Sequence, residues 1–259
     1  MLVDTHIHLD AAEFDGDREQ VIQVARAAGV GGFVVPAVDV ASFDRVAALA
    51  AVHPDVHHAY GIHPMYVMNA RDDDLEVLAA RLAQGDAMAV GEIGLDFFVP
   101  GLDPVRQERF FVAQLRLARA HGLPVILHVR RAVDQILKHL RRIEVCGGVA
   151  HAFNGSRQQA EAFMALGFKL GFGGAMSFDG SSRIRKLAAE LPLDAIVLET
   201  DAPDIPPAWS QGCRNEPSNL ARFAAILAEL RAISVEEVGE ATSCNAAAVF
   251  PGIGRLGVA

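Results

Sequence analysis

The sequence predicts an α/β fold in which eight strands and eight helices form one closed (β/α)8 TIM barrel. Short apolar runs alternate with longer segments of helical periodicity, and this alternation occurs eight times along the chain. The length of 259 residues suits a barrel, which commonly needs about 250. Hydrophobic side chains make up 51% of the chain, so we expect a large buried core and no extended disorder.

Strands are predicted where apolar and β-branched residues follow one another. Several of these runs are almost continuously apolar, as expected of parallel strands that are buried on both faces. The predicted strands are Leu2–Ile7, Gly32–Val38, Val56–Ile62, Met88–Leu95, Val125–Val129, Gly148–Phe153, Lys169–Gly173 and Ala195–Thr200.

Helices are predicted between the strands, and two of them have clear terminal signals. Asp103 is an expected N-cap, followed by Pro104 as the first residue of a helix that extends to about Ala120. Gly122 then ends this helix. A capping box of Ser234 and Glu237 begins the last helix. The alternation implies right-handed βαβ units and a parallel sheet.

The rival architecture is an open, doubly wound sheet that binds its ligand where the strand order reverses. No GxGxxG or GxxxxGK[ST] motif follows the first strand, so nothing supports a nucleotide-binding fold of that kind. No linker or repeat divides the chain, and we expect residues 1–259 to form a single domain. The stretch 201–217, rich in Pro and Gly, is predicted to be a loop over the site.

Composition narrows the choice of partner and compartment. Asp and Glu number 32 against 23 Lys and Arg, so the net charge of −9 provides no broad basic surface for a duplex or an anionic membrane. Three widely spaced cysteines make neither a disulfide framework nor a CxxC zinc motif, which is typical of a reducing compartment. The sequence shows no secretory signal and no apolar run long enough to cross a bilayer. We therefore expect a cytoplasmic protein.

Four imidazoles and two carboxylates lie at the carboxyl ends of the predicted strands. These ends form one concave face in a barrel, so side chains from different strands meet there. His6 and His8 are two residues apart and are expected to share one face of the first strand. The full set is His6, His8, Glu92, His128, His151 and Asp201.

Such a set predicts a metal centre. Two carboxylates and four imidazoles in one pocket need compensating charge, and divalent cations such as zinc, manganese or iron supply it. Six ligands exceed the number that one catalytic zinc takes, so we expect two cations, roughly 3.5–4 Å apart. Glu92 is the expected bridge, with one oxygen for each cation. Each residue alone has an ordinary structural explanation, and only their joint placement favours a metal site.

At these residues the sequence resembles the TatD-type metal-dependent deoxyribonuclease family, a branch of the amidohydrolase-like barrels. Matching motifs occur in the family's order from residue 4 to about residue 245. They are DTHIHLD (4–10), GIHP (61–64), GEIGLD (91–96), LPVILHVR (123–130), HAFNGS (151–156), ETDAP (199–203) and RNEP (214–217). Two positions depart from the family's pattern and concern substrate preference: Asn154, where Ser is common, and the loop 204–209.

The resemblance implies a hydrolase of phosphodiester bonds, usually in DNA and often acting as an exonuclease. It implies two divalent cations, with zinc, magnesium and manganese all open, bound by the six residues named above. The expected mechanism is in-line attack on phosphorus by a hydroxide that the two metals activate. Asp201 is expected to act as general base, and Glu92 to bridge the metals. His63, outside the six ligands, is expected to bind the phosphate or donate to the leaving oxygen.

Contact with nucleic acid is expected to be local, at the ends of DNA or an oligonucleotide. Arg130 is a candidate phosphate ligand, although a rim ion pair with a carboxylate explains it equally well. Bases are expected to stack on Phe97, Phe98, Phe153 or Trp209, with core packing somewhat favoured for Phe153. No membrane and no obligatory protein partner is expected. Further arginines gather in the second half of the chain: Arg131, Arg141, Arg142, Arg157, Arg183, Arg185 and Arg214.

Two other hypotheses remain open. One is an amidohydrolase-type enzyme that cleaves a C–N or ester bond, such as a lactonase, deaminase or deacylase. Many such barrels bridge their metals with a carboxylated Lys on the fourth strand, but this chain has Glu92 there and no Lys nearby, so only a carboxylate-bridged subtype fits. The other is a non-catalytic binding protein on the same scaffold, which the complete ligand set disfavours.

Overall fold

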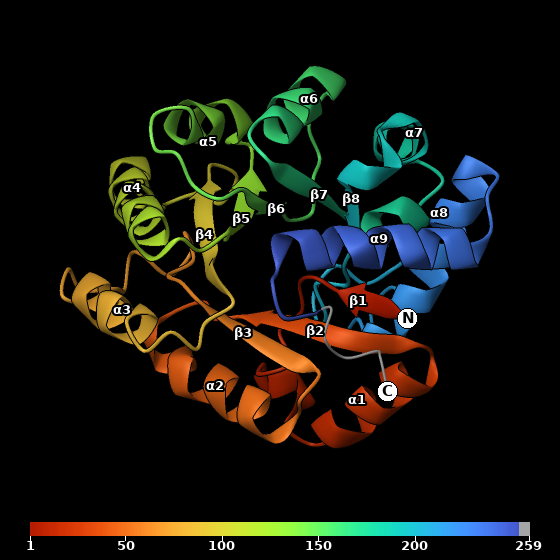
Figure 1. The fold of residues 1–259 in the computed structure, drawn as a ribbon, viewed down its shortest axis with the longest axis horizontal. Coiled ribbons are helices and arrows are strands. Elements are labelled where there is room, and N and C mark those ends of the chain that lie inside the picture. The colour runs from red at the N-terminus through yellow and green to blue at the C-terminus, as the bar shows by residue number, and fades with distance from the viewer. Residues whose placement is uncertain (254–259) are drawn as a thin grey trace.

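The computed structural model describes residues 1–253, and these form the predicted barrel of parallel strands with helices outside (Figure 1). The strands pair in chain order, each with the next. They are β1 (Leu2–Asp4), β2 (Val30–Pro36), β3 (Val56–Tyr60), β4 (Ala89–Asp96), β5 (Val125–Arg130), β6 (Gly148–Ala150), β7 (Phe168–Phe172) and β8 (Ile196–Leu198). Residues 254–259 of the predicted domain lie outside the described residues.

Helices connect the strands and form an outer ring around them (Figure 1). The α-helices of residues 1–253 are α1 (Arg18–Ala27), α2 (Phe43–Val52), α3 (Asp74–Leu82), α4 (Pro104–His121), α5 (Val133–Leu140), α6 (Arg157–Ala165), α7 (Ser182–Glu190), α8 (Leu220–Arg231) and α9 (Val235–Val249). Five single turns of 3-10 helix add to them: η1 (Ala12–Phe14), η2 (Val40–Ser42), η3 (Gly174–Ser177), η4 (Leu193–Ala195) and η5 (Pro217–Asn219).

The predicted helix signals are confirmed. The Asp103 side chain accepts a hydrogen bond from the amide of Val105 at 2.9 Å, and α4 ends at Gly122, whose φ of 63° is left-handed. The Ser234 hydroxyl and the Glu237 carboxylate cap each other's amides at the start of α9. Polar capping residues therefore fix where these two helices begin.

The amino-terminal end of the barrel is closed by α9 and the residues that follow it. β1 to β6 and β8 each contribute one inward side chain to a cluster with Phe250 and Ile253, which are almost fully buried. The inward residues are Val3, Val34, Ala59, Ala89, Ile126, Val149 and Val197. This end is filled, so the barrel can receive a ligand at the carboxyl ends of its strands.

Side-chain hydrogen bonds help join β8 to β1. Thr200 donates to the buried Asp4 carboxylate from its amide at 2.9 Å and from its hydroxyl at 2.6 Å. The amide of Thr5 donates to the carbonyl of Leu198 at 3.1 Å. Burial raises the pKa of Asp4 to about 8, although the hydrogen bonds from Thr200 act in the opposite direction. Among residues 1–253, no strand pairing joins β8 and β1, so these bonds link the two ends of the sheet.

Four strands, β1, β3, β6 and β8, are shorter than predicted, and one inference from them is wrong. β1 ends at Asp4, so His6 and His8 lie in the loop beyond it and do not share a strand face. In that loop the amide of Ile7 donates to Val34 on one side, and the amide of His8 donates to Ala202 on the other. The segment is thus held between β2 and the loop after β8. β6 and β8 also end early, which places His151 and Asp201 in loops.

Two observations bear on the predicted cytoplasmic location. Cys146, Cys213 and Cys244 are all free thiols, and each is exposed. Within residues 1–253, none of the helices combines the length and the hydropathy that crossing a bilayer requires. The cytoplasmic location stays a prediction.

Candidate metal centre

The candidate site is a cavity of about 1450 Å³ at the carboxyl ends of the strands. Loops from around the barrel line it, and all the predicted ligands except His6 contribute to its wall. His6 lies behind them and is fully buried. The topology therefore brings together side chains that are up to 195 positions apart in the sequence, from His6 to Asp201.

Glu92 lies between two pairs of imidazoles and is only 2% exposed. Its Oε2 is 3.2 Å from Nε2 of His6 and 3.7 Å from Nε2 of His8. Its Oε1 is 3.0 Å from Nδ1 of His128 and 3.3 Å from Nε2 of His63. Each carboxylate oxygen thus faces its own pair of rings, which is the arrangement expected of a bridging ligand.

Asp201 lies close to three imidazoles, those of His6, His8 and His151. Its Oδ1 is 3.5 Å from Nε2 of His6 and 3.6 Å from Nε2 of His8, and its Oδ2 is 3.5 Å from Nε2 of His151. The rings of His6 and His151 stack with centroids 3.6 Å apart. Asp201 itself has a left-handed φ of 59°, a conformation that Asp tolerates better than most residues. Strained backbone of this kind is common at functional sites.

The donor set fits divalent cations. Three overlapping groups have all their ligand atoms within 4.8 Å of one another: His6, Glu92 and His151; His6, His8 and Asp201; and His63, Glu92 and His128. Nε2 of His6 and Nε2 of His8 face each other at 3.3 Å, and the buried Nδ1 of His6 has no hydrogen-bond partner among residues 1–253. Imidazole and carboxylate together are ligands typical of zinc, manganese and iron.

The electrostatics of the centre keep its carboxylates ionised. Burial would raise the pKa of Glu92, but the rings of His63 and His6 hold it well below its ordinary value. Burial opposes ionisation of Asp201 as well, and His151 outweighs it to lower that pKa. Burial lowers the pKa of His6, which favours its neutral ring. Against the effect of burial, nearby carboxylates raise the pKa of His128 and of His151, so these two rings would lose a proton when a metal binds. Ionised carboxylates and neutral imidazoles are the forms that bind metal.

Two carboxylates that were missed from the sequence lie behind proposed ligands, Asp96 in a hydrogen bond with His128 and Glu199 within ion-pair distance of His151. Oδ2 of Asp96 is 3.0 Å from Nε2 of His128, and Oε1 of Glu199 is 3.0 Å from Nδ1 of His151. Against the effect of burial, the hydrogen bond from His128 lowers the pKa of Asp96 to about 2. Despite burial, Glu199 and Asp201 raise the pKa of His151 well above its ordinary value. Carboxylates behind metal-binding histidines fix the ring orientation. Asp96 and Glu199 belong to the motifs GEIGLD and ETDAP, and this was the signal in the sequence that could have identified them.

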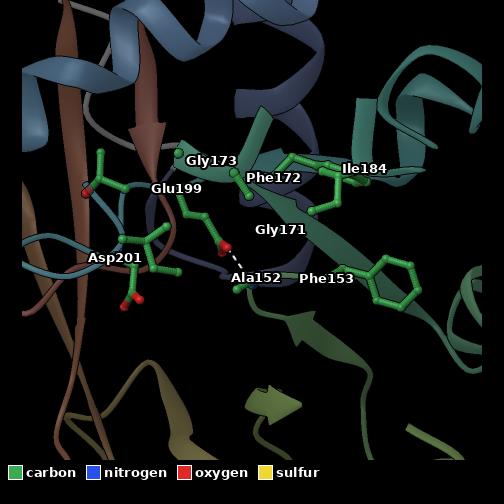
Figure 2. A pocket seen from close by; sticks show the side chains of 12 residues that line it. Ala152, Phe153, Gly171, Phe172, Gly173, Ile184, Glu199 and Asp201 are labelled. Carbon is green, nitrogen blue, oxygen red and sulfur yellow. Dashed lines mark hydrogen bonds between the residues drawn. The ribbon is translucent and has the colours of Figure 1, made fainter. Parts of the chain in front are cut away.

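The Glu199 carboxylate is closely packed against neighbouring residues (Figure 2). Its Oε1 accepts a hydrogen bond from the amide of Ala152 at 2.6 Å, and its Oε2 is buried without a partner. A chamber of about 20 Å³ adjoins it, lined in part by Gly171 and Asp201. A Cβ on Gly171 would overlap Oε2 of Glu199, so only glycine allows this approach.

The predicted substrate contacts divide into two groups. His63 lines the cavity, and so does Arg130, whose guanidinium lies over the Phe98 ring at 4.0 Å and only 3.9 Å from Asp96. Phe97 and Phe98 are exposed on the cavity wall.

Of the other two aromatic candidates, Phe153 has the core packing favoured from the sequence, and Trp209 is not among the described residues that line the cavity. Phe153 is 2% exposed, packs edge-on against Phe163 and points away from Asp201 (Figure 2). Trp209 packs against Phe223, and its indole donates to Asn219 at 3.0 Å. Their hydrophobic surface is used in the core, so neither offers a free face to a base.

Comparison with known proteins gives consistent matches. The profile of the family described as "TatD related DNase" matches residues 3–251. An uncharacterized metal-dependent hydrolase of Escherichia coli K12, YjjV, is 44% identical over 96% of this chain and 97% of its own length. The 3′-5′ ssDNA/RNA exonuclease TatD of Cronobacter turicensis is 33% identical over 96% of this chain and 97% of its own. The crystal structure of YjjV, a TatD homologue from Escherichia coli K12, has a TM-score of 0.93 at 42% identity, covering 96% of this chain and 98% of that one.

Proposed function

This chain belongs to the family of TatD-related DNases and is a metal-dependent hydrolase, and from this premise we propose that it cleaves phosphodiester bonds at the ends of DNA. The observation that supports the proposal most directly is the Glu92 carboxylate, whose two oxygens face separate pairs of imidazoles. Sites with two bridged metals are common among phosphatases and nucleases. A relative 33% identical to this chain is named an exonuclease for single-stranded DNA and RNA.

The proposed ligands are the six residues predicted from the sequence. His6 and His8 lie between one oxygen of Glu92 and one of Asp201, and His128 lies at the other oxygen of Glu92, while His151 contacts both His6 and Asp201. Zinc, magnesium and manganese are the candidate ions. Bound there, two divalent cations would neutralise charge on the phosphate and lower the pKa of an attacking water.

Asp201 is the proposed general base. It lines the cavity, so its carboxylate can reach a water placed against the phosphate. Its pKa is lowered, which keeps it ionised and able to accept a proton. The surrounding His6, His8 and His151 limit its motion and fix the direction from which it accepts that proton.

His63 is the proposed donor to the phosphate or to the leaving oxygen. The amide of Met65 donates to Nδ1 of His63 at 3.2 Å, so the ring proton of a neutral His63 lies on Nε2. That nitrogen faces Glu92 at the cavity, and it can donate to an incoming oxygen. Arg130, beside the centre, is the proposed phosphate ligand.

Metal removal tests the hydrolase proposal. Protein dialysed against chelator should lose cleavage of end-labelled single-stranded DNA and regain it with zinc, magnesium or manganese, added separately. Products should shorten from one end in single-nucleotide steps. Unchanged cleavage in excess chelator would contradict the metal-dependent mechanism.

The same reconstituted protein separates the other hypotheses. RNA, lactones, amides and aminoacyl esters are assayed beside DNA at equal metal content. Cleavage of a C–N or carboxylic ester bond without cleavage of DNA would favour the amidohydrolase-type alternative. Absence of turnover on every substrate with every metal would favour a binding protein on this scaffold.

A further inference from the structure

Three arginines on one wall of the cavity lack full compensation by carboxylates. Elsewhere many arginines are paired. Examples are Arg26 with Asp55, Arg109 with Asp72, Arg157 with Glu161 and Arg214 with Asp17. Arg131 and Arg183 line the cavity and have no ion pair within the described part of the chain, and Arg130 only approaches the buried Asp96 at 3.9 Å. Other described arginines without an ion pair, among them Arg141 and Arg142, do not line the cavity.

Phe98 orients the first two of these arginines. The guanidinium carbons of Arg130 and Arg131 lie 4.0 Å and 4.6 Å from the centroid of its ring. A guanidinium stacked on a ring keeps its edge free to donate to a phosphate. Arg131 also has a left-handed φ of 54°, which directs it differently from the strand residue before it. Two forks of donors are thereby held next to each other at the rim.

Asn154 orients the third. Nη2 of Arg183, in the first turn of α7, donates to Oδ1 of Asn154 at 2.5 Å. A neutral amide fixes the guanidinium without cancelling its charge, as a carboxylate in the same place would.

The opposite wall has the opposite sign. Asp10, Glu13 and Asp204, from the loops after β1 and β8, line that side of the cavity. One acid, Asp134 at the start of α5, lies on the arginine side and accepts a hydrogen bond from Gln159 at 2.8 Å. Arg45 approaches Asp10 at 3.4 Å and compensates it in part. A phosphate is therefore attracted to the side of β5 to β7 and repelled from the side of β8 and β1.

We propose that Arg131 and Arg183, continuing from Arg130, form a second phosphate subsite for the phosphate next to the one that is cleaved. The inference rests on the proposed phosphodiesterase function and specifies its substrate. The substrate is a single strand with at least two consecutive phosphodiesters. From the metal centre, the bound strand extends over the ends of β5 to β7. The acidic wall then receives the terminal nucleoside, which has no further phosphate.

The test compares a dinucleotide, which has one phosphodiester, with a trinucleotide, which has two, both without terminal phosphates. On the metal-loaded enzyme we expect kcat/KM to be about tenfold higher for the trinucleotide, because a charged pair of this kind contributes that much to binding. The double variant Arg131→Gln/Arg183→Gln should bring this ratio close to one, mainly through KM. The matched control is Arg141→Gln/Arg142→Gln, which removes the same charge from two exposed residues at the end of α5 that do not line the cavity.

Binding of a fluorescein-labelled thymidine oligonucleotide, measured in chelator, separates the two proposals. The Arg131→Gln/Arg183→Gln protein should bind more weakly, with a salt slope smaller by about 0.7 for each phosphate that is no longer bound, and the control should match the unaltered protein. If the enzyme cleaves nothing but shows this weaker binding, the hydrolase proposal is wrong and the subsite stands. In an enzyme that cleaves DNA, a length preference that is absent, or that survives in the double variant, overturns the subsite. Binding that the double variant leaves unchanged overturns it in either case.

Discussion

His128 and His63 differ in whether the ring nitrogen that faces Glu92 carries a proton. Oε1 of Glu92 lies 3.0 Å from Nδ1 of His128 and 3.3 Å from Nε2 of His63. Asp96 faces the other nitrogen of His128 and accepts its proton, which leaves Nδ1 free to bind a cation. The amide of Met65 donates to the other nitrogen of His63, which leaves the proton on Nε2. The partner behind each ring thus separates a proposed ligand from a proposed proton donor.

Replacing Asp201 tests the proposed base. Asp201→Asn should lower kcat by at least a hundredfold, because an amide does not accept the proton of the attacking water. Unfolding temperature, measured beside the kinetics, should stay close to that of the unaltered protein. Because Asp201 is also a proposed ligand, turnover is compared at equal metal content. The control is Asp179→Asn, an exposed carboxylate in the loop before α7. Turnover of Asp201→Asn within a few-fold of the control would exclude Asp201 as the base.

Replacing Asp96 tests the support behind His128. Asp96→Asn keeps an oxygen for the amides of Phe98 and Val99 but removes the charge that faces His128. Loss of such a carboxylate typically weakens metal affinity by 10- to 100-fold, about what we expect in a metal titration. Asp86→Asn removes a similar contact, to His58, away from the centre and should leave the metal affinity unchanged. Equal affinity in the two variants would show that Asp96 has no positioning role.

At the scale of elements, loops just beyond the strands hold most of the site. β1, β6 and β8 end before His6, His151 and Asp201, which follow them in loops. Hydrogen bonds between neighbouring loops replace the ladder there, including one from the amide of Asp201 to the carbonyl of His6 at 2.9 Å. Loops tied together in this way can place imidazoles in positions that regular strands do not offer.

Gly171 in β7 tests how closely one element must approach another. In Gly171→Ala the new methyl group would overlap the Glu199 carboxylate, and overpacking of this kind costs about 1–3 kcal/mol of folding free energy. Displacing Glu199 also disturbs His151, so metal affinity should fall with stability. Urea unfolding and a metal titration measure the two effects. Gly180→Ala, where no atom lies within 4 Å of the added Cβ, should change neither.

At the scale of the whole molecule, the two ends of the barrel have separate tasks. One end is filled by Phe250, Ile253 and the inward residues of the strands, and the other holds the cavity with its metal ligands. Stability and chemistry can therefore be altered independently.

Phe250→Ala tests this separation. Removal of a fully buried Phe typically costs about 3–5 kcal/mol, which is what we expect in urea unfolding. Metal content and kcat of the folded fraction at low temperature should be unaffected, since the centre lies at the opposite end. Val235→Ala, at an exposed position of α9, is the control for stability. A loss of metal in Phe250→Ala while the protein remains folded would show that the ends are coupled.

The sequence by itself determined the barrel and the set of residues at its open end. Apolar periodicity is a local property, so it located all eight strands, and each observed strand overlaps a predicted one. Strand order then required His6, His8, Glu92, His128, His151 and Asp201 to meet on one face, as they do. Their role as metal ligands stays a prediction. The early ends of β1, β6 and β8 were missed because the hydrogen bonds that end the ladder come from distant residues.

Only the tertiary structure decided which polar atom faces which. Asp96 behind His128, Glu199 behind His151 and Thr200 on Asp4 are contacts between residues with no local signature, and they depend on how neighbouring strands and loops align. The same holds for Phe153, whose ring turns into the core while Phe98 stays at the rim. The net charge of −9 predicts no basic surface, yet folding places three arginines and one acid, Asp134, on one side of the cavity and three acids with Arg45 on the other. The net charge carries no information about where the charges lie, whereas a phosphate interacts mainly with the charges close to it, because salt screens those farther away.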